Sequence, residues 1–310
     1  MVNIRFRTKE AKEFYEKVND YIDYIDIKEA SKEGYKKILI EYVLYTDRLP
    51  DLPIRHDVIV YRERLKVRLK ASSVQKHIVV IRNFYRWYYS MGYGHNIAEG
   101  IKGMKIESDF KREALSVKDS IRLLKRAEFN AKKDVIGFRN YAVISILITT
   151  GLRTIELERA DVEDIVHVND EYVLYVMGKG HDDKDAYVKL SKQVYNIIEE
   201  YLIARSDSYT PLFINHTCHS LGSRMRTRTI RGVVKETLRQ IGIDNPKYSA
   251  HSLRHTTATL ALYEGANIED TQQLLRHKDP STTQIYVHKE KKRNSNYEYK
   301  ISDTLFGAKK

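Results

Sequence analysis

The sequence predicts a mainly α-helical protein of two domains, with one small antiparallel sheet in the second domain. Apolar side chains recur at helical spacing through the first hundred residues, whereas 100–112 has glycines, charges and little periodicity. Between about 160 and 190 the spacing changes to that of strands. We therefore place a helical domain at 1–104, a linker at 105–111 and a mixed α/β domain at 112–310.

Four helices are expected in the first domain, at 9–25, 31–49, 57–70 and 73–92. Ser31 is the predicted N-cap of the second helix, and Pro50 stands just past its end. The fourth helix carries an apolar stripe made of Val80, Phe84, Trp87 and Tyr88. We interpret these aromatic side chains as core packing rather than as a surface on which bases stack.

The second domain begins with a helix at 115–128, for which Ser116 is the candidate cap. A strongly apolar helix at 139–151 follows and ends at Gly151. The runs EYVLYVMGKG and AYVKLS are rich in β-forming residues and predict a hairpin. From Lys192 onward the pattern is helical again.

Composition excludes several classes of protein. The 310 residues are 42% hydrophobic, and no apolar run reaches the length of about 18 residues that a membrane span needs. The first residues lack the apolar stretch of a secretory signal, so we expect a cytoplasmic protein without a membrane partner. Cys218 is the only cysteine, which excludes an intramolecular disulfide and a cysteine-based zinc site.

The net charge of +12 is concentrated in two segments, 61–86 with a net charge of +7 and 224–239 with +5. Such basic runs favour a nucleic-acid partner, to which binding would depend on salt because bound counterions are released. The candidate DNA-contacting residues in these runs are Arg62, Arg64, Lys66, Arg68, Lys70, Lys76, Arg82, Arg86, Arg224, Arg226, Arg228 and Arg231.

Two cations are candidates for holding an anion. Arg153 follows the helix stop at Gly151, and its planar guanidinium matches a phosphate; pairing with Glu156 is the alternative, and we expect Glu156 to contact and orient it. Lys179 stands between two glycines at the hairpin tip, where a lysine is either simply solvated or able to act as a general acid. Lys184, in the same turn, is the weaker rival.

The stretch from 251 to 289 concentrates further chemistry. His251 and Arg254 are three residues apart at a predicted helix start and therefore share a face. His255 is interpreted as a buried structural histidine, and His277 as either a helix cap or an anion ligand. Tyr286 is one of 23 tyrosines, singled out by its spacing from His277. A tyrosine nucleophile has an ordinary pKa near 10 and needs neighbouring cations to lose its proton.

In order along the chain, TGLRTIEL, GKG, HSLRH and LLRHKDPSTTQIYVH resemble the motifs of the tyrosine recombinases, the phage-integrase family. The resemblance covers both domains. It implies a two-domain clamp around duplex DNA, with a helical core-binding domain and a catalytic domain that ends in a tail. The implied activating residues are Arg153, Lys179, His251, Arg254 and His277, and the implied nucleophile is Tyr286.

The resemblance also implies the reaction, which joins Tyr286 to a scissile phosphate as a 3′-phosphotyrosine and frees a 5′-hydroxyl. Arg153 and Arg254 would stabilise the phosphate oxygens, Lys179 would protonate the leaving oxygen, and His251 would exchange the tyrosine proton. Because the phosphotyrosine keeps the bond energy, neither a metal nor another cofactor is expected. The expected role is integration or excision of a mobile element, with Xer-type dimer resolution as the alternative.

The resemblance also implies partners. We expect four protomers on two DNA recombination sites, with room for accessory DNA-bending proteins. The tail after Tyr286 would dock on a neighbouring subunit through Ile301, Leu305 and Phe306. One departure concerns Arg276, which stands where the family usually has a glycine before the histidine. Glycine suits the left-handed backbone of a helix end, so Arg276 either alters that path or adds a phosphate contact.

Three other functions compete with the recombinase. A type IB topoisomerase-like enzyme would nick and rejoin DNA without exchanging strands. A catalytically silent DNA-binding module would have no need of Tyr286. A hydrolase could hold a metal through His251, His255 and His277, although no carboxylate accompanies them in the motif.

Overall fold

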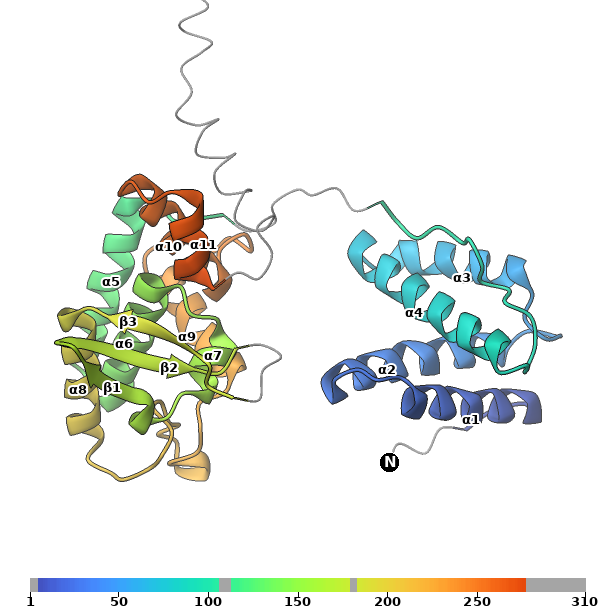
Figure 1. The fold of residues 1–310 in the computed structure, drawn as a ribbon, viewed down its shortest axis with the longest axis horizontal. Coiled ribbons are helices and arrows are strands. Elements are labelled where there is room, and N and C mark those ends of the chain that lie inside the picture. The colour runs from blue at the N-terminus through green and yellow to red at the C-terminus, as the bar shows by residue number, and fades with distance from the viewer. Residues whose placement is uncertain (1–4, 106–112, 179–182, 277–310) are drawn as a thin grey trace, which may run out of the picture. The chain divides into compact units, whose positions relative to one another are not determined.

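The structure, a computed structural model, describes residues 5–105, 113–178 and 183–276. The chain divides into two compact units, Met1–Asp109 and Phe110–Lys310, each with a hydrophobic core of its own. Helices dominate both units, and the second unit alone carries a small antiparallel sheet among the described residues (Figure 1). The predicted fold class, mainly helical with one small sheet, is therefore confirmed.

The first unit contains the helices α1 (Lys9–Tyr24), α2 (Glu29–Thr46), α3 (Arg55–Arg68) and α4 (Ala71–Ser90). Helix α1 is capped by Thr8, whose hydroxyl accepts a hydrogen bond from the Ala11 amide at 3.1 Å. The prediction of Ser31 as the cap of α2 is wrong. The helix already begins at Glu29, and the Ser31 amide donates to the Lys28 carbonyl at 2.7 Å within the first turn.

Aromatic side chains fill the core of the first unit, where α4 packs against the other three helices. Phe84 of α4 meets Phe14 of α1 edge to face, with ring centroids 5.3 Å apart. Tyr42 and Tyr85 place their buried hydroxyls 3.2 Å apart. Since Phe84 and its neighbour Trp87 are buried, the interpretation of this stripe as core packing is confirmed.

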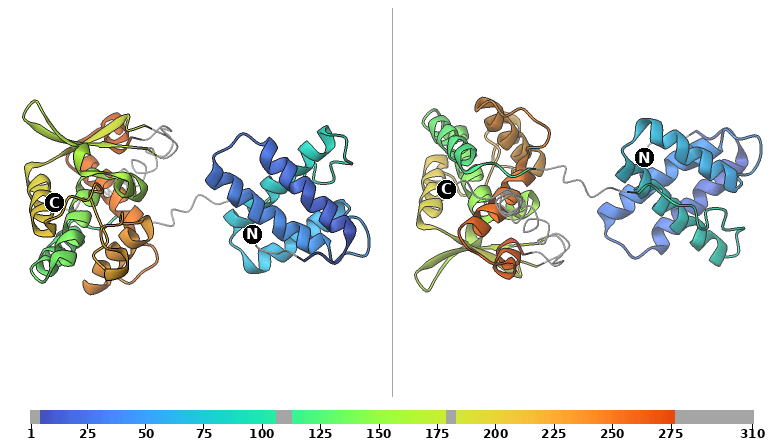
Figure 2. Two further views of the ribbon diagram at one scale, coloured as in Figure 1. Left: turned by 90° about the horizontal axis from the view of Figure 1, so that it is seen from below. Right: turned by 90° about the horizontal axis from the view of Figure 1, so that it is seen from above.

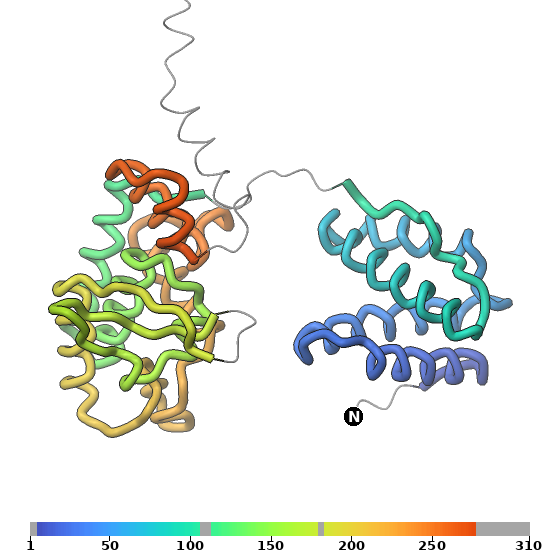
Figure 3. Tube along the Cα trace, viewed as in Figure 1, coloured from blue at the N-terminus to red at the C-terminus, as the bar shows by residue number. Residues whose placement is uncertain are grey.

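The helices of the second unit are α5 (Val117–Ala131), α6 (Val135–Thr150), α7 (Thr154–Arg159), α8 (Lys192–Arg205), α9 (Thr227–Gln240), α10 (Ala250–Tyr263) and α11 (Ile268–Leu275), with short 3-10 turns at Val162–Asp164 and Cys218–Ser220. Ser116 caps α5 as predicted, accepting from the Asp119 amide at 3.0 Å. Helix α6 is central, because it packs against α5, α8 and α10, and it ends at Gly151 in the left-handed conformation. The trace in Figure 3 follows this unit from the green α5 and α6 to the orange-red α10 and α11.

The sheet has the strand order β1 (Ile165–Val168), β2 (Glu171–Val176) and β3 (Ala186–Leu190), all antiparallel. The predicted hairpin of β2 and β3 is confirmed, with Val176 opposite Ala186. The sequence did not predict β1, which pairs Ile165 with Leu174. In both views of Figure 2 the sheet covers one side of this unit and α5 lies on the opposite side.

None of the helices in the described part of the chain is long and apolar enough to cross a membrane.

Candidate active site

Arg153 lies directly before α7 and is held by Glu156 of that helix. The Arg153 amide donates to Glu156 Oε2 at 2.8 Å, and its Nη1 donates to Oε1 at 2.8 Å. Glu156 is only 1% exposed, whereas the Arg153 side chain is 30% exposed. The predicted contact between the two residues is confirmed, and one buried carboxylate fixes both the backbone and the side chain of Arg153.

Arg254 of α10 is buried, with 1% of its surface exposed. Its Nη1 donates to the Gly151 carbonyl at the end of α6, and its Nη2 donates to the Leu275 carbonyl at the end of α11. Carbonyl groups at a helix C-terminus carry partial negative charge, and a buried cation needs such partners. The ends of two helices therefore anchor the Arg254 guanidinium.

Arg276 ends α11 in the left-handed conformation, with φ 53° and ψ 46°. The backbone path that glycine would favour is thus kept by an arginine. The Arg276 side chain, 15% exposed, places Nη2 3.0 Å from Glu156 Oε2 and donates through Nη1 to the Leu274 carbonyl at 3.0 Å. Sequence reasoning treated Arg276 as a departure from the family and missed this ion pair, for which an arginine in a glycine position was the only signal.

Glu156 stays ionised in this setting. Burial alone would raise its pKa, but the charge of Arg276 and the hydrogen bonds and charge of Arg153 outweigh burial and hold the pKa below its ordinary value. Arg153 and Arg276 thus share the Glu156 carboxylate, while Arg254 donates to the backbone carbonyls of Gly151 and Leu275. The excess of positive charge suits an anion such as a phosphodiester.

Helix α10 begins at Ala250, so His251 and Arg254 stand in its first turns as predicted. His251 is exposed, and His255 is buried at 5% exposure. The two imidazole rings lie perpendicular with centroids 4.8 Å apart. No group of three or more His, Cys, Asp or Glu side chains is placed to hold a metal ion in the part of the chain that the structure describes.

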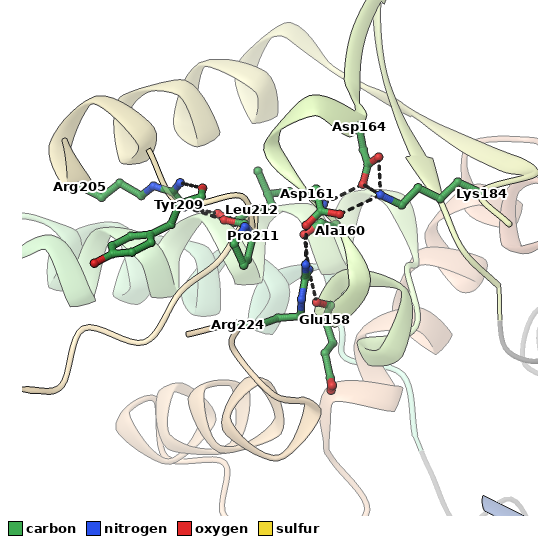
Figure 4. Close-up of polar contacts among 10 residues, drawn as sticks. All are labelled: Glu158, Ala160, Asp161, Asp164, Lys184, Arg205, Tyr209, Pro211, Leu212 and Arg224. Atoms are coloured by element: carbon green, nitrogen blue, oxygen red, sulfur yellow. Dashed lines mark hydrogen bonds and ion pairs between the residues drawn. The ribbon is translucent and has the colours of Figure 1, made fainter. Parts of the chain in front are cut away.

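The residues on either side of the hairpin tip are tied to the end of α7 and to the segment that follows it. Arg159 Nη1 donates to the Gly178 carbonyl at 3.1 Å on one arm. On the other arm, Lys184 Nζ lies 2.9 Å from Asp161 Oδ2 and 2.6 Å from Asp164 Oδ1 (Figure 4). Burial would lower the pKa of Lys184, but these two aspartates outweigh it and raise the pKa. Lys184 therefore serves as an ion-paired anchor of the hairpin.

Three of the predicted catalytic residues, Lys179, His277 and Tyr286, lie outside the described residues. The same holds for the tail residues Ile301, Leu305 and Phe306.

The candidate DNA-contacting residues of the second unit differ in their surroundings. Arg224 Nη1 donates to the carbonyls of Glu158 and Ala160 at 3.0 and 2.9 Å, and its Nη2 pairs with Asp161 (Figure 4). These contacts make Arg224 a brace inside the unit. Arg226 is exposed and lies 3.2 Å from Glu158 Oε1. Arg228 and Arg231, on α9, are exposed.

In the first unit, some cations of the basic segment 61–86 contact neighbouring side chains. Glu63, the one acid of this segment, pairs with Arg62 Nη2 at 2.9 Å through Oε1 and with Lys66 Nζ at 2.8 Å through Oε2. Arg68 pairs with Glu41, and Arg64 lies over the Tyr45 ring, 5.1 Å from the centroid. The remaining candidates are the exposed Lys70, Lys76 and Arg86 and the half-buried Arg82.

A helical unit followed by a mixed α/β unit with arginines at its helix ends agrees with the predicted class, the two-domain tyrosine recombinases. Residues 116–293, more than half of the chain, match the model of the phage integrase family. The chain therefore belongs to the phage integrase family, the tyrosine recombinases, which are enzymes that cleave and rejoin DNA.

Curated relatives agree with this assignment. The chain is 32% identical over 231 residues to the tyrosine recombinase XerC of Pelobacter propionicus, covering 74% of this chain and 72% of the relative. It is 28% identical over 289 residues to the tyrosine recombinase XerD of Listeria innocua, covering 87% of this chain and 93% of the relative.

Solved structures share the fold. A XerH site-specific recombinase bound to a palindromic difH substrate, in a post-cleavage complex, aligns with a TM-score of 0.73 at 20% identity over 88% of this chain and 79% of that one. A lambda integrase dimer bound to a COC′ core site aligns with a TM-score of 0.68 at 14% identity, over 86% and 96% of the two chains.

Proposed function

We propose that this chain is a site-specific recombinase that cleaves and rejoins duplex DNA through Tyr286. The proposed activating residues are Arg153, Lys179, His251, Arg254 and His277, with Glu156 orienting Arg153. The observation that carries the proposal is how two predicted phosphate ligands are held. Arg254 donates to the carbonyls of Gly151, two residues before Arg153, and of Leu275. Arg276, the residue after Leu275, shares Glu156 with Arg153. In a member of this family, such an electropositive centre suits a scissile phosphate.

The proposed first step forms a bond between the Tyr286 oxygen and the phosphorus atom and breaks the bond from phosphorus to the 5′-oxygen. Lys179 gives a proton to that leaving oxygen, and His251 takes the tyrosine proton. Arg153 and Arg254 stabilise the charge that builds on the non-bridging oxygens, and His277 donates to the same phosphate. A 5′-hydroxyl from the partner strand reverses the step and joins the exchanged strands.

We further propose a clamp in which the unit of 1–104 and the unit of 112–310 contact one DNA duplex, joined by the linker 105–111. Four such protomers would bring two recombination sites together in the cytoplasm. The tail, through Ile301, Leu305 and Phe306, would dock on a neighbouring protomer, and accessory DNA-bending proteins would assist on long sites. The similar structures that are bound to DNA, including a dimer of lambda integrase, support a duplex partner.

The proposed biological reaction is integration or excision of a mobile element. Resolution of chromosome or plasmid dimers is the second candidate, because the curated relatives at 28% to 32% identity are named XerC and XerD.

Covalent capture of DNA tests the chemistry. Denaturing a cell extract that contains the protein and recovering protein-linked DNA should give an adduct with the natural chain and none with Tyr286→Phe. Tyr263→Phe is the matched control, since Tyr263 is exposed at the end of α10 and lies outside the proposed centre. An adduct that persists in Tyr286→Phe would refute the assignment of the nucleophile.

Sequencing the captured DNA separates the two biological reactions. Junctions at both ends of one mobile segment support integration or excision, and a single chromosomal site supports dimer resolution. Incubation of the protein with two copies of the recovered site then separates a recombinase from a topoisomerase-like enzyme, because only the recombinase yields exchanged strands.

A further inference from the structure

We propose that Arg276 is a positioning residue for Arg153, acting through their shared partner Glu156. This inference rests on the proposed function, in which Arg153 holds the scissile phosphate. It assigns a role to the one residue that departs from the family pattern at this end of α11. Arg276 thereby replaces the conformational freedom of a glycine with an ionic contact.

The geometry divides Glu156 between the two arginines. Its Oε1 accepts from Arg153 Nη1 at 2.8 Å, while its Oε2 accepts from the Arg153 amide at 2.8 Å and from Arg276 Nη2 at 3.0 Å. A carboxylate bonded on both oxygens cannot rotate freely, so Arg276 helps to set the plane in which Glu156 receives the Arg153 guanidinium. Bidentate recognition of a phosphate depends on that plane.

Burial strengthens the ion pair between Arg276 and Glu156. Glu156 is 1% exposed and Arg276 15% exposed, so water screens their attraction weakly. Arg276 Nη1 also donates to the Leu274 carbonyl at 3.0 Å, which ties the guanidinium back to the last turn of α11. Arg276 is therefore held from its own helix while it holds Glu156 of α7.

The backbone of Arg276 supports a role for its side chain. A φ of 53° is unfavourable for any residue with a Cβ, and glycine would adopt it without strain. The neighbouring Leu275 carbonyl accepts from Arg254 Nη2. One helix end thus contacts Arg254 through its backbone and the partner of Arg153 through a side chain, and it places both predicted phosphate ligands relative to each other.

The test compares Arg276→Gly, Arg276→Lys and Glu156→Gln with the double variant that carries Glu156→Gln and Arg276→Gly. Single-turnover cleavage is measured on the DNA site recovered by covalent capture. We expect Arg276→Gly to slow cleavage about tenfold to a hundredfold, because small displacements of a catalytic group cost that much. Arg276→Lys should recover part of the rate, and the double variant should cleave no more slowly than Glu156→Gln alone.

A matched control separates backbone from side-chain effects. Ser206 ends α8 in the same left-handed conformation, with φ 46°. Ser206→Gly therefore makes the same backbone change away from the centre and should leave the cleavage rate unchanged. Arg276→Gly should keep the far-UV circular dichroism spectrum of the natural chain and a cooperative unfolding transition, which distinguishes loss of positioning from loss of folding.

A readout without DNA keeps the inference separate from the proposed function. In ¹⁵N–¹H spectra of the arginine side chains, the Arg153 Nε–Hε signal, assigned by its loss in Arg153→Lys, should move in Arg276→Gly toward the position of solvent-exposed arginines. An unmoved signal, natural cleavage by Arg276→Gly, or an equal slowing by Arg276→Gly with and without Glu156→Gln would overturn the inference. Failure of the natural chain to form any adduct would instead count against the proposed function.

Discussion

Gly151 is the position where a single added methyl group should disturb the candidate site most. Its φ of +64° is left-handed, and a Cβ there would lie 2.6 Å from Leu275 Cδ2. Leu275 is fully buried, so its side chain would have to shift within the core to admit the Cβ. The left-handed conformation costs an alanine about 1–2 kcal/mol, and overpacking in a core costs about 1–3 kcal/mol. Gly151→Ala should therefore destabilise the second unit by about 2–5 kcal/mol.

Gly242 provides the control for the backbone part of this loss. Its φ is +84°, and a Cβ there would have no neighbour within 4 Å. Gly242→Ala should cost only the conformational part, about 1–2 kcal/mol. The difference between the two variants then measures the contact between Gly151 and Leu275.

Urea unfolding measures both variants in the full chain. Far-UV circular dichroism follows the helices, while the fluorescence of Trp87, the only tryptophan, reports the first unit. Because the two units have separate cores, the transition seen by Trp87 should not shift in either variant. Equal losses for Gly151→Ala and Gly242→Ala would refute the tight packing of Leu275 on Gly151. The anchoring of Arg254 between the carbonyls of these two residues would then also be in question.

Two further predictions concern charge. Burial raises the pKa of Asp161, but hydrogen bonds and charges from Arg224 and Lys184 outweigh it and lower the pKa below its ordinary value. A pKa lowered by folding adds stability that is complete above the unfolded value of about 4 and is lost as the pH falls through the folded value. Urea unfolding between about pH 2 and 7 should therefore show a steeper acid loss in the natural chain than in Asp161→Asn, and parallel curves would contradict this. Neutralising the exposed Lys70, Lys76 and Arg86 should reduce the slope of log binding constant against log salt by about 0.9 for each DNA phosphate that these side chains neutralise. Fluorescence anisotropy of a labelled duplex measures the slope, Lys132→Gln is the exposed single-charge control, and an unchanged slope would move the DNA surface elsewhere.

Local signals in the sequence predicted the parts of the fold that local chemistry determines. Ser116 caps α5 and Gly151 ends α6, because a hydroxyl or a missing Cβ satisfies the helix end directly. The prediction of Ser31 as a cap was wrong because Lys28 and Glu29 begin the helix without a side-chain cap. Strand β1 was missed because its four residues, IVHV, are mostly exposed and pair with β2 across a two-residue turn.

In the candidate site, too, contacts between residues close in the sequence were predictable and long-range contacts were not. The pairing of Arg153 with Glu156 was predictable because three residues separate them on one turn. The pairing of Glu156 with Arg276 spans 120 residues and depends on how α7 and α11 pack, which no periodic pattern encodes. The sequence offered Lys184 as the weaker rival to Lys179 and Arg224 as a DNA contact, and the structure places both against Asp161.

The two predicted phosphate arginines are held by different chemistry, and the difference matters for their roles. Arg254 is fixed by two helix-end carbonyls, which set the plane of its guanidinium while supplying only partial negative charge, about half a charge per helix end. Arg153 is held by the full negative charge of Glu156, which by itself would offset much of the positive charge of Arg153. Because Arg276 pairs with the same carboxylate, that offset is shared between the two arginines. Arg276 therefore restores to Arg153 part of the attraction for an anion that Glu156 removes. Arg276, despite its backbone strain, therefore lets Glu156 orient Arg153 without cancelling the attraction of Arg153 for an anion.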